Sequence, residues 1–378
     1  MKTALCGLTL AMLGACGAIV EPKDRVKVDR FAELLIVDDA LLSGEGESSA
    51  VPSEQIASFG TLWRAAAGAQ QEVALARWLS EWESVSDAPA FVYEQVRCRW
   101  LRATQDNQCD PSCGRCAERR LDPDKAPFRL IGVSYRPDLA LATGEPQLSK
   151  QECRLVFALS SDARASDPNR ELAVSVIFEL RLTAPAEAAS WAERFHSLSP
   201  LSARPPAFRR ALSELVADAV QAPKEVSLRL RDDAFSNGQM LAWQLGPREL
   251  TRVGLANTVD PAQASQSDLR AHLLAQRDDL ERGEPNLPAA WRRSEVSRAT
   301  PLPETGDPAL DPLLAVVTCQ GCHGDERTIG GFHLAPRQAN RQRVSRFLHD
   351  PEHPADDELA RREDALRTLL ALTPGVPE

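Results

Sequence analysis

Methionine and aromatic residues are scarce in this sequence. Three methionines occur among 378 residues, and aromatic side chains make up 5% of the chain. Two of the methionines lie in the first 15 residues, which leaves Met240 as the only methionine in the rest of the chain. A thioether ligand from the C-terminal third of the sequence is therefore excluded.

Long apolar runs and the common hydrolase motifs are also absent. Beyond residue 15, no apolar run approaches the length of about 18 residues that a membrane-spanning helix needs. The sequence contains no G-x-S-x-G, no H-E-x-x-H and no phosphate-binding P-loop. No pair of acidic residues suggests a polymer-cleaving site. The sequence thus gives no indication of an enzyme.

Isolated polar residues within the predicted elements do not change this interpretation. His196 and His272 lie on amphipathic segments, where histidines more often cap helices or border the core than catalyse. Glu179, at a strand end, and Asp138, after Arg136-Pro137, are candidate functional acids, although acids at strand ends commonly bind backbone groups or arginine. Acidic residues outnumber basic ones by 54 to 44, which argues against nucleic acid as a partner.

The first 15 residues predict an export signal rather than part of the fold. Lys2 precedes an apolar stretch, Ala4 to Leu13, that is too short to span a bilayer. The stretch leads into Leu13-Gly14-Ala15-Cys16, which resembles the lipobox of bacterial lipoproteins. The resemblance implies a diacylglycerol on Cys16 and, because glycine follows, an outer-membrane anchor facing the periplasm or the cell surface. An ordinary secretory signal, with Cys16 incidental, is the alternative.

One short motif specifies a cofactor. Cys319-Gln320-Gly321-Cys322-His323 has the C-x-x-C-H spacing of c-type haem attachment. Two thiols three positions apart on a helical turn can each add to one vinyl group of the porphyrin, and the histidine that follows is placed below the iron. Since this chemistry takes place outside the cytoplasm, it agrees with the export signal. The motif predicts haem c on Cys319, Cys322 and His323.

The sixth ligand of such a haem would be His333, His349 or His353, unless the position is open. His333 is favoured because two glycines before it, at 330 and 331, let the loop turn back. A disulfide between Cys319 and Cys322 competes closely with haem in an exported protein. A zinc site of Cys319, Cys322, His323 and His333 is a weaker third possibility, because it needs thiols that stay reduced outside the cytoplasm.

Five further cysteines are candidates for disulfides. Cys98, Cys109, Cys113, Cys116 and Cys153 all follow the export signal. The spacing of Cys109, Cys113 and Cys116 also occurs in radical enzymes with an iron–sulfur cluster. Those enzymes are cytoplasmic and built on repeated βα units, so a disulfide knot that includes Cys98 or Cys153 is favoured here.

Composition divides the chain after the signal into four parts. Residues 16–52 have the composition of a tether, and residues 53–283 form the body. Residues 284–308 are a proline-rich linker. Residues 309–378 then form a small C-terminal module that carries the C-x-x-C-H motif.

Apolar spacing predicts the elements of the body. A pair of helices broken near Gly68 is expected between 53 and 83, with its tryptophans in the core, followed by a disulfide-stapled loop over 84–126. The predicted strands cover 128–135, 153–159, 172–182, 225–231, 240–245 and 250–259. Later helices are predicted over 185–198, 207–220 and 267–282.

The C-terminal module is predicted to be helical. Helices are expected over 310–319, near 341–348 and over 356–372, with a loop over 324–340. In the body, strands cluster instead of alternating strictly with helices. The sequence therefore predicts an α+β fold, with a mostly antiparallel sheet, flanking helices and a small helical C-terminal module.

Several segments are distinctive as a set. They are Ser58-Phe59-Gly60, Trp78 to Trp82, Ala126 to Leu130, Arg136 to Leu139, Val176 to Glu179, Trp191 to His196, Thr318 to His323, Phe332-His333 and Pro336-Arg337. With these segments, the chain resembles an uncharacterised family of exported bacterial proteins, many of them lipoproteins, over about residues 55–350. It departs from the family pattern around 140–150 and 255–262. The resemblance implies a fold and a location but no activity.

These features predict an exported lipoprotein with one c-type haem and a role in electron transfer. The alternative is a non-enzymatic structural or binding lipoprotein in which Cys319 and Cys322 form a disulfide. We expect the protein to contact the membrane through its lipid anchor alone. The sequence does not identify a redox or protein partner.

Overall fold

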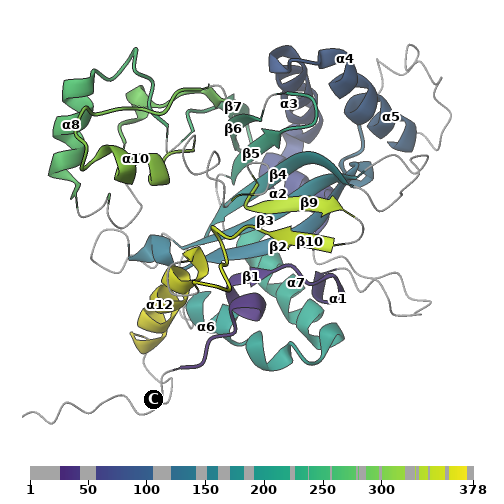
Figure 1. Cartoon of the computed structure of the whole chain (residues 1–378). Helices are drawn as coiled ribbons and strands as arrows, with labels where there is room; N and C mark the ends of the chain where they lie inside the picture. Colours follow the sequence, from purple (N-terminus) through teal and green to yellow (C-terminus); the bar gives the residue numbers. More distant parts are fainter. Residues whose placement is uncertain are drawn as a thin grey trace, which may run out of the picture.

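The computed structural model describes most of the chain between Val26 and Leu372 (Figure 1). The described residues are 26–42, 57–104, 121–141, 151–160, 171–182, 191–221, 226–236, 238–255, 258–277, 280, 287–297, 300–319, 328, 332–338, 341–353 and 357–372.

A large antiparallel sheet forms the centre of the molecule. Seven of its strands lie side by side in sequence order, and the eighth, β8, pairs with β6. The strands are β1 (Leu35–Ile36), β2 (Phe128–Arg136), β3 (Glu152–Ser160), β4 (Glu171–Arg181), β5 (Val226–Asp232), β6 (Gln239–Leu245), β7 (Leu250–Arg252) and β8 (Glu295–Val296). The sheet with its helices confirms the predicted α+β class.

Helices cover one face of this sheet, and the main core lies between them. The alternating side chains of β4 show the arrangement, since Val174, Val176, Phe178 and Leu180 are all buried on this face. The helices that contribute to the core are α1 (Asp39–Leu42), α2 (Phe59–Ala67), α3 (Gln71–Val85), α4 (Pro89–Val92), η3 (Tyr93–Cys98), α5 (Arg99–Thr104), α6 (Trp191–His196) and α7 (Pro205–Gln221).

A tryptophan cluster joins the first helices to the sheet. Trp63, Trp78 and Trp82 are fully buried, and the ring centroids of Trp63 and Trp78 lie 5.6 Å apart. This confirms the expectation that these rings pack in the core. The break between α2 and α3 occurs at Gly68, whose φ of 55° lies in the region that favours glycine.

A smaller apolar cluster lies beside the sheet. It joins α8 (Gln266–Ala275) to α10 (Asp311–Val317) through Leu269, Leu273 and Leu314. The intervening η8 (Ala289–Trp291) and strand β8 belong to the stretch predicted as a linker, 284–308. Part of that stretch is therefore built into the fold.

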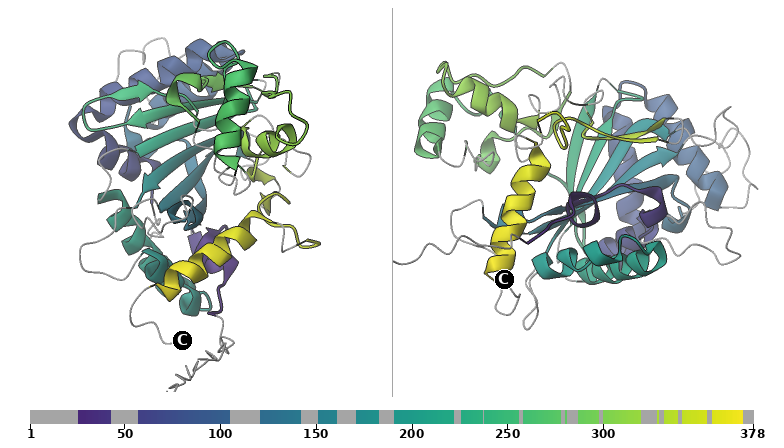
Figure 2. Two further views of the ribbon diagram at one scale, coloured as in Figure 1. Left: turned by 90° about the vertical axis from the view of Figure 1, so that its left-hand side faces the viewer. Right: turned by 60° about the horizontal axis from the view of Figure 1, so that its bottom comes forward.

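The C-terminal residues pack on the body rather than forming a separate module. Leu359, Leu366 and Leu369 of α12 (Glu358–Ala371) belong to the main core. Strands β9 (Leu334–Gln338) and β10 (Arg341–Val344) pair with each other, and β9 contacts β2, β3 and β4. Figure 2 shows this hairpin on the side of the sheet opposite α6 and α7.

Several local predictions are wrong. Residues 26–42, predicted as part of a tether, contain η1 (Arg30–Leu34), β1 and α1 and bury apolar side chains in the main core. The loop predicted over 324–340 contains strand β9. The segment 84–126, predicted as a loop, contains α4, η3 and α5, whose buried Val92, Val96 and Trp100 recur at helical spacing. The short helix predicted near 341–348 is instead strand β10, because pairing with β9 determines its conformation. Short 3-10 helices complete the described elements: η2 (Gly68–Gln70), η4 (Pro123–Lys125), η5 (Asp138–Ala140) and η7 (Ser199–Leu201), together with the π-helix η1 (Arg30–Leu34).

Candidate functional site

The face of the sheet opposite the helices carries charged side chains on its central strands. Arg154 of β3 lies opposite Glu179 of β4. The Nε of Arg154 is 3.2 Å from Oε1 of Glu179, and the Nε of Arg229, on β5, donates to Oε2 over 2.8 Å. Although burial opposes it, the charges of Arg229 and Arg154 hold the pKa of Glu179 below its ordinary value. Glu179 is thus paired with two arginines, one of the kinds of partner expected for an acid at a strand end.

A second charged group joins the end of β2 to the start of α12. The Nε of Arg136 donates to Oδ1 of Asp138 over 2.9 Å, and NH2 of Arg136 lies 3.7 Å from Oε1 of Glu358. NH1 of Arg362 donates to the Ser134 hydroxyl over 2.6 Å. Burial, followed by the charge of Arg136, lowers the pKa of Arg362 to about 10, so Arg362 stays charged at neutral pH. Asp138 is therefore also paired with an arginine.

Cys319 lies on this charged face, two residues beyond α10. Its side chain is buried in an apolar patch with Met240 and Ala242 of β6, Leu255 and Val296. Thr318 closes the helix, because its N–H donates to the Leu314 carbonyl and its hydroxyl to the Ala315 carbonyl. Cys319 carries a thiol and is not part of a disulfide. The Cys319–Cys322 disulfide of the alternative interpretation is therefore not formed in this structure.

His333 directly precedes β9 and is partly buried on the same face. Its ring packs against the Phe347 ring with centroids 4.6 Å apart, and its Nδ1 is 3.5 Å from the Ser345 hydroxyl. Burial, and after it the positive charge of nearby arginines, lowers the pKa of His333 to about 3. These arginines are Arg362, Arg231, Arg154 and Arg136. The imidazole is therefore uncharged at neutral pH.

The positions of Cys319 and His333 can be compared through their neighbours on strand β5. Cys319 shares an apolar cluster with Ala242 of β6, and Ala242 lies opposite Arg229 of β5. Arg231 lies near His333, and its guanidinium stacks on the Phe332 ring at 5.2 Å. Since Arg229 and Arg231 are two residues apart on one strand, they share a face of the sheet. The structure thus places Cys319 and His333 over the same face of the sheet.

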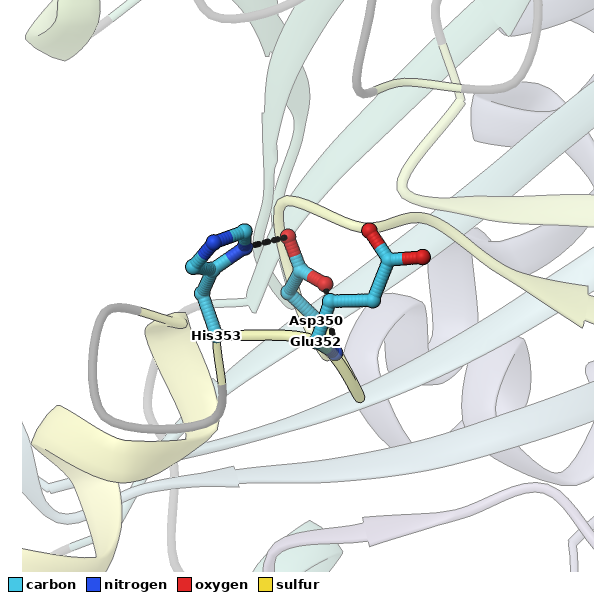
Figure 3. Close-up of side chains that lie close together, drawn as sticks. All are labelled: Asp350, Glu352 and His353. Carbon is cyan, nitrogen blue, oxygen red and sulfur yellow. Dashed lines mark hydrogen bonds and ion pairs between the residues drawn. The ribbon is translucent and has the colours of Figure 1, made fainter.

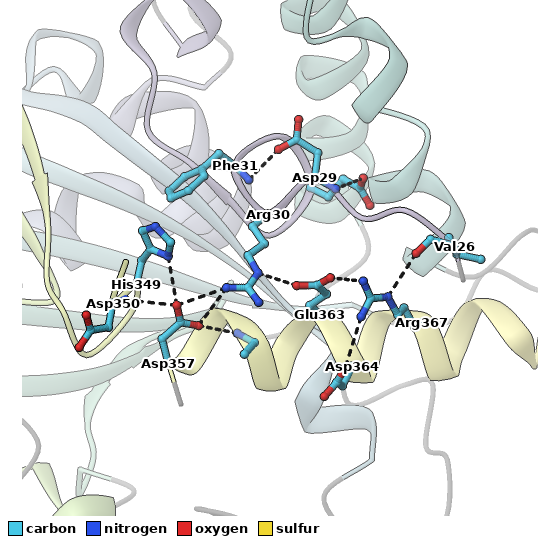
Figure 4. A network of polar contacts seen from close by, with 12 residues as sticks. Val26, Asp29, Arg30, Phe31, His349, Asp350, Asp357, Glu363, Asp364 and Arg367 are labelled. Atoms are coloured by element: carbon cyan, nitrogen blue, oxygen red, sulfur yellow. Dashed lines mark hydrogen bonds and ion pairs between the residues drawn. The ribbon is translucent and has the colours of Figure 1, made fainter. Parts of the chain in front are cut away.

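The other two candidate axial histidines have acidic partners elsewhere. Nδ1 of His349 is 3.1 Å from Oδ2 of Asp357, a buried side chain (Figure 4). Nδ1 of His353 is 3.5 Å from Asp350, and its side chain is 67% exposed (Figure 3). With Glu352, these last two residues are the only trio of metal-ligand side chains within 4.8 Å among the residues described. The trio lies on a single surface loop.

The predicted disulfide cysteines have different environments. Cys98 is buried at the end of η3 and is disulfide-bonded. Cys153 is a free thiol, which corrects its prediction as a disulfide partner. It lies on the helix-covered face of β3, opposite Tyr135 and Leu180, and burial raises its pKa. Three further candidates, Cys109, Cys113 and Cys116, lie outside the described residues.

Three further site residues also lie outside the described residues. They are Cys16 of the predicted lipid anchor and Cys322 and His323 of the C-x-x-C-H motif. No described helix is both long enough and apolar enough to cross a bilayer. The lipid anchor and the two remaining haem-binding residues therefore stay predictions.

The arginines of this face were not predicted as site residues. The run Leu228-Arg229-Leu230-Arg231 has the alternation of a strand with one face in the core and the other in water. In the structure, Leu334 of β9 covers part of the second face, because it packs there with Ile131, Val156 and Ala158. A strand pattern shows which residues share a face but not what covers that face.

No protein-family model matches the chain, and no curated protein or solved structure matches it. The resemblance to a family of exported proteins therefore remains a prediction from the sequence.

Proposed function

We propose that the protein is an exported lipoprotein that carries one covalently attached haem and transfers electrons. Cys319, Cys322, His323 and His333 would hold the haem, and a diacylglycerol on Cys16 would anchor the chain to the outer membrane. The observation that carries the proposal is that the Cys319 thiol and the His333 imidazole lie over the same face of the sheet.

The described residues suit such a group in three respects. Cys319 is a thiol set in an apolar patch, and an apolar porphyrin edge is compatible with that surrounding. An uncharged His333 has a lone pair that can bind a metal. Arg154 and Arg229 keep 23% and 30% of their side chains exposed, and guanidinium groups pair with carboxylates such as those of haem.

The chain itself would set the ligands and their surroundings. When bound, a haem held by two histidines supplies a one-electron couple of lower potential than one held by histidine and methionine. The Ser345 hydroxyl near Nδ1 of His333 is the kind of partner that orients a metal-binding imidazole. The charged side chains of Glu179, Arg154 and Arg229 would make the surroundings of the haem polar on this face of the sheet.

The first experiment is expression of the full chain in a bacterium that exports it and matures c-type cytochromes. We expect the intact mass to include one haem and the lipid of Cys16, and the absorption spectrum to show a Soret band. Cys319→Ser together with Cys322→Ser should remove the haem mass, because both thioether bonds are then lost. His333→Ala should keep the covalent haem but convert it from low-spin to high-spin, since one axial ligand is gone.

The matched control is His353→Ala, because His353 is 67% exposed and paired with Asp350. This variant should keep the wild-type spectrum. A wild-type protein with no haem mass and no Soret band would overturn the proposal. Zinc found in its place, at about one ion per chain, would instead support a tetrahedral site of two thiolates and two imidazoles.

A further inference from the structure

The β9–β10 hairpin, which begins directly after His333, is docked on the sheet through an apolar contact. Leu334 is 6% exposed and packs with Ile131, Val156 and Ala158 of strands β2 and β3. Because Leu334 follows His333 directly, its position constrains where the imidazole can lie. The docking contact and the candidate ligand are thus adjacent in the chain.

Gly132 provides the space that Leu334 occupies. A Cβ atom at position 132 would lie 2.3 Å from Cδ2 of Leu334, a separation that real Cβ atoms do not show. The pairing of β2 with β3 shifts register between Leu130 and Gly132, so the strand is irregular at this point. Glycine therefore suits position 132, because the Leu334 side chain occupies the space that a side chain at this position would need.

His333 is also held by residues that directly follow the second strand of the hairpin, β10. The Ser345 N–H donates to the His333 carbonyl over 2.8 Å, and the Ser345 hydroxyl lies near Nδ1. The Phe347 ring packs against the imidazole at an interplanar angle of 35°. These contacts fix the backbone and the ring relative to the hairpin, whereas Leu334 fixes the hairpin relative to the sheet.

The far end of β9 is held by a buried carboxylate. The backbone N–H of Arg337 donates to Oε2 of Glu171, at the start of β4, over 2.5 Å. Across the hairpin, Nε2 of Gln342 donates to the Ala335 carbonyl over 2.6 Å. Two points of attachment, at Leu334 and at Arg337, prevent the hairpin from pivoting about either one.

We propose that Gly132 and Leu334 are positioning residues that hold the His333 imidazole at the place where it binds iron. This inference rests on the proposed haem function. Leu334 seated over Gly132 fixes the height of His333 above the sheet, and Ser345 with Phe347 fixes the orientation of its ring.

The test is Gly132→Ala, which adds one methyl group where Leu334 lies. In the matured protein we expect partial loss of the low-spin spectrum and an affinity for added imidazole that is about tenfold higher, the size of effect seen when partners of a metal ligand are disturbed. In the full chain prepared without haem, we expect faster amide hydrogen exchange over residues 332–347. The matched control is Gly246→Ala, because a Cβ there has its nearest neighbour at an ordinary 3.8 Å.

A second variant keeps the test decisive if Gly132→Ala does not fold. Leu334→Ala removes the same contact without adding a clash, and the double variant Gly132→Ala/Leu334→Ala restores the room for the new methyl group. Leu334→Ala and the double variant should both show the same loss of low-spin spectrum and the same faster exchange as Gly132→Ala, because Leu334 no longer holds His333 in place. Wild-type spectra and exchange in a folded Gly132→Ala or Leu334→Ala protein would overturn the positioning role. A wild-type protein without haem would overturn the proposed function, and hydrogen exchange would still test the docking.

Discussion

Glu33 is a fully buried carboxylate whose partner is distant in sequence. Its Oε1 accepts from the Asp29 N–H over 2.8 Å, and its Oε2 lies 2.8 Å from Nδ1 of His196. The hydrogen bond to Glu33 raises the pKa of His196 above its ordinary value of 6.5. A buried acid thus ties η1, near the N-terminus, to the last residue of α6.

This pair predicts a pH-dependent stability. Because the folded-state pKa of His196 is raised, its stabilisation is full below pH 6.5 and is lost as the pH rises through the folded-state value. Urea unfolding should show that His196→Gln lowers the unfolding free energy by about 1 kcal/mol at about pH 5.5, with allowance for solvent screening, and by less at about pH 9. His353→Gln should have no effect at either pH. An equal loss for His196→Gln at both pH values would contradict the assignment.

The sequence shows that His196 borders the core, but not which residue it meets. His196 follows Phe195 on an amphipathic helix, and that pattern is local. Glu33 is 163 residues away, so only the folded arrangement brings the two together. The same limit applies to the candidate site. Its cysteines and histidine can be picked out from the sequence by their residue types and spacing, but the arginines that surround them in space cannot.

At the level of elements, α12 begins at a buried side chain with several partners. Asp357 is its N-cap, and Oδ1 accepts from the Ala360 N–H over 2.7 Å. Oδ2 accepts from the Asp350 N–H and lies 3.3 Å from NH1 of Arg30 (Figure 4). One carboxylate therefore caps the helix and ties it to η1 and to the loop after β10.

Asp357→Ala should destabilise the protein by about 2–4 kcal/mol, since it removes an N-cap and hydrogen bonds to a charged group. Asp357→Asn is the matched variant, because its amide oxygen can still accept from the Ala360 N–H while the charge is gone. It should cost less than Asp357→Ala. Urea unfolding monitored by circular dichroism measures both, and equal losses would show that capping adds nothing beyond the charge.

The strands were predictable where one face lies in the core. In β4, Val174, Val176, Phe178 and Leu180 alternate, and a prediction of 172–182 agrees with the observed Glu171–Arg181. Strand β9 was not predictable, because Leu334-Ala335-Pro336-Arg337-Gln338 follows two glycines and contains proline. Its conformation depends on distant partners, Gly132 and Glu171, that no local pattern reveals.

At the level of the whole molecule, the C-terminal residues complete the body. The boundary predicted at 309 follows composition, which changes at the prolines. Residues beyond it nevertheless bury apolar side chains against the N-terminal half, as α12 does through Leu359, Leu366 and Leu369. A site on β9 is consequently built on the same core as the sheet below it, so its geometry depends on the stability of the whole core.

Leu366→Ala tests whether α12 and the rest of the body unfold as one cooperative unit. Leu366 is fully buried in the main core, so we expect a loss of about 2–5 kcal/mol in unfolding free energy. The loss should be visible in tryptophan fluorescence, because the buried tryptophans that report on the core, such as Trp78 and Trp243, lie on α3 and β6. Leu372→Ala is the control, since Leu372 is 54% exposed and should change stability by less than about 0.5 kcal/mol. A fluorescence transition unchanged by Leu366→Ala would mean that α12 unfolds independently, and the C-terminal residues would then be a separate unit after all.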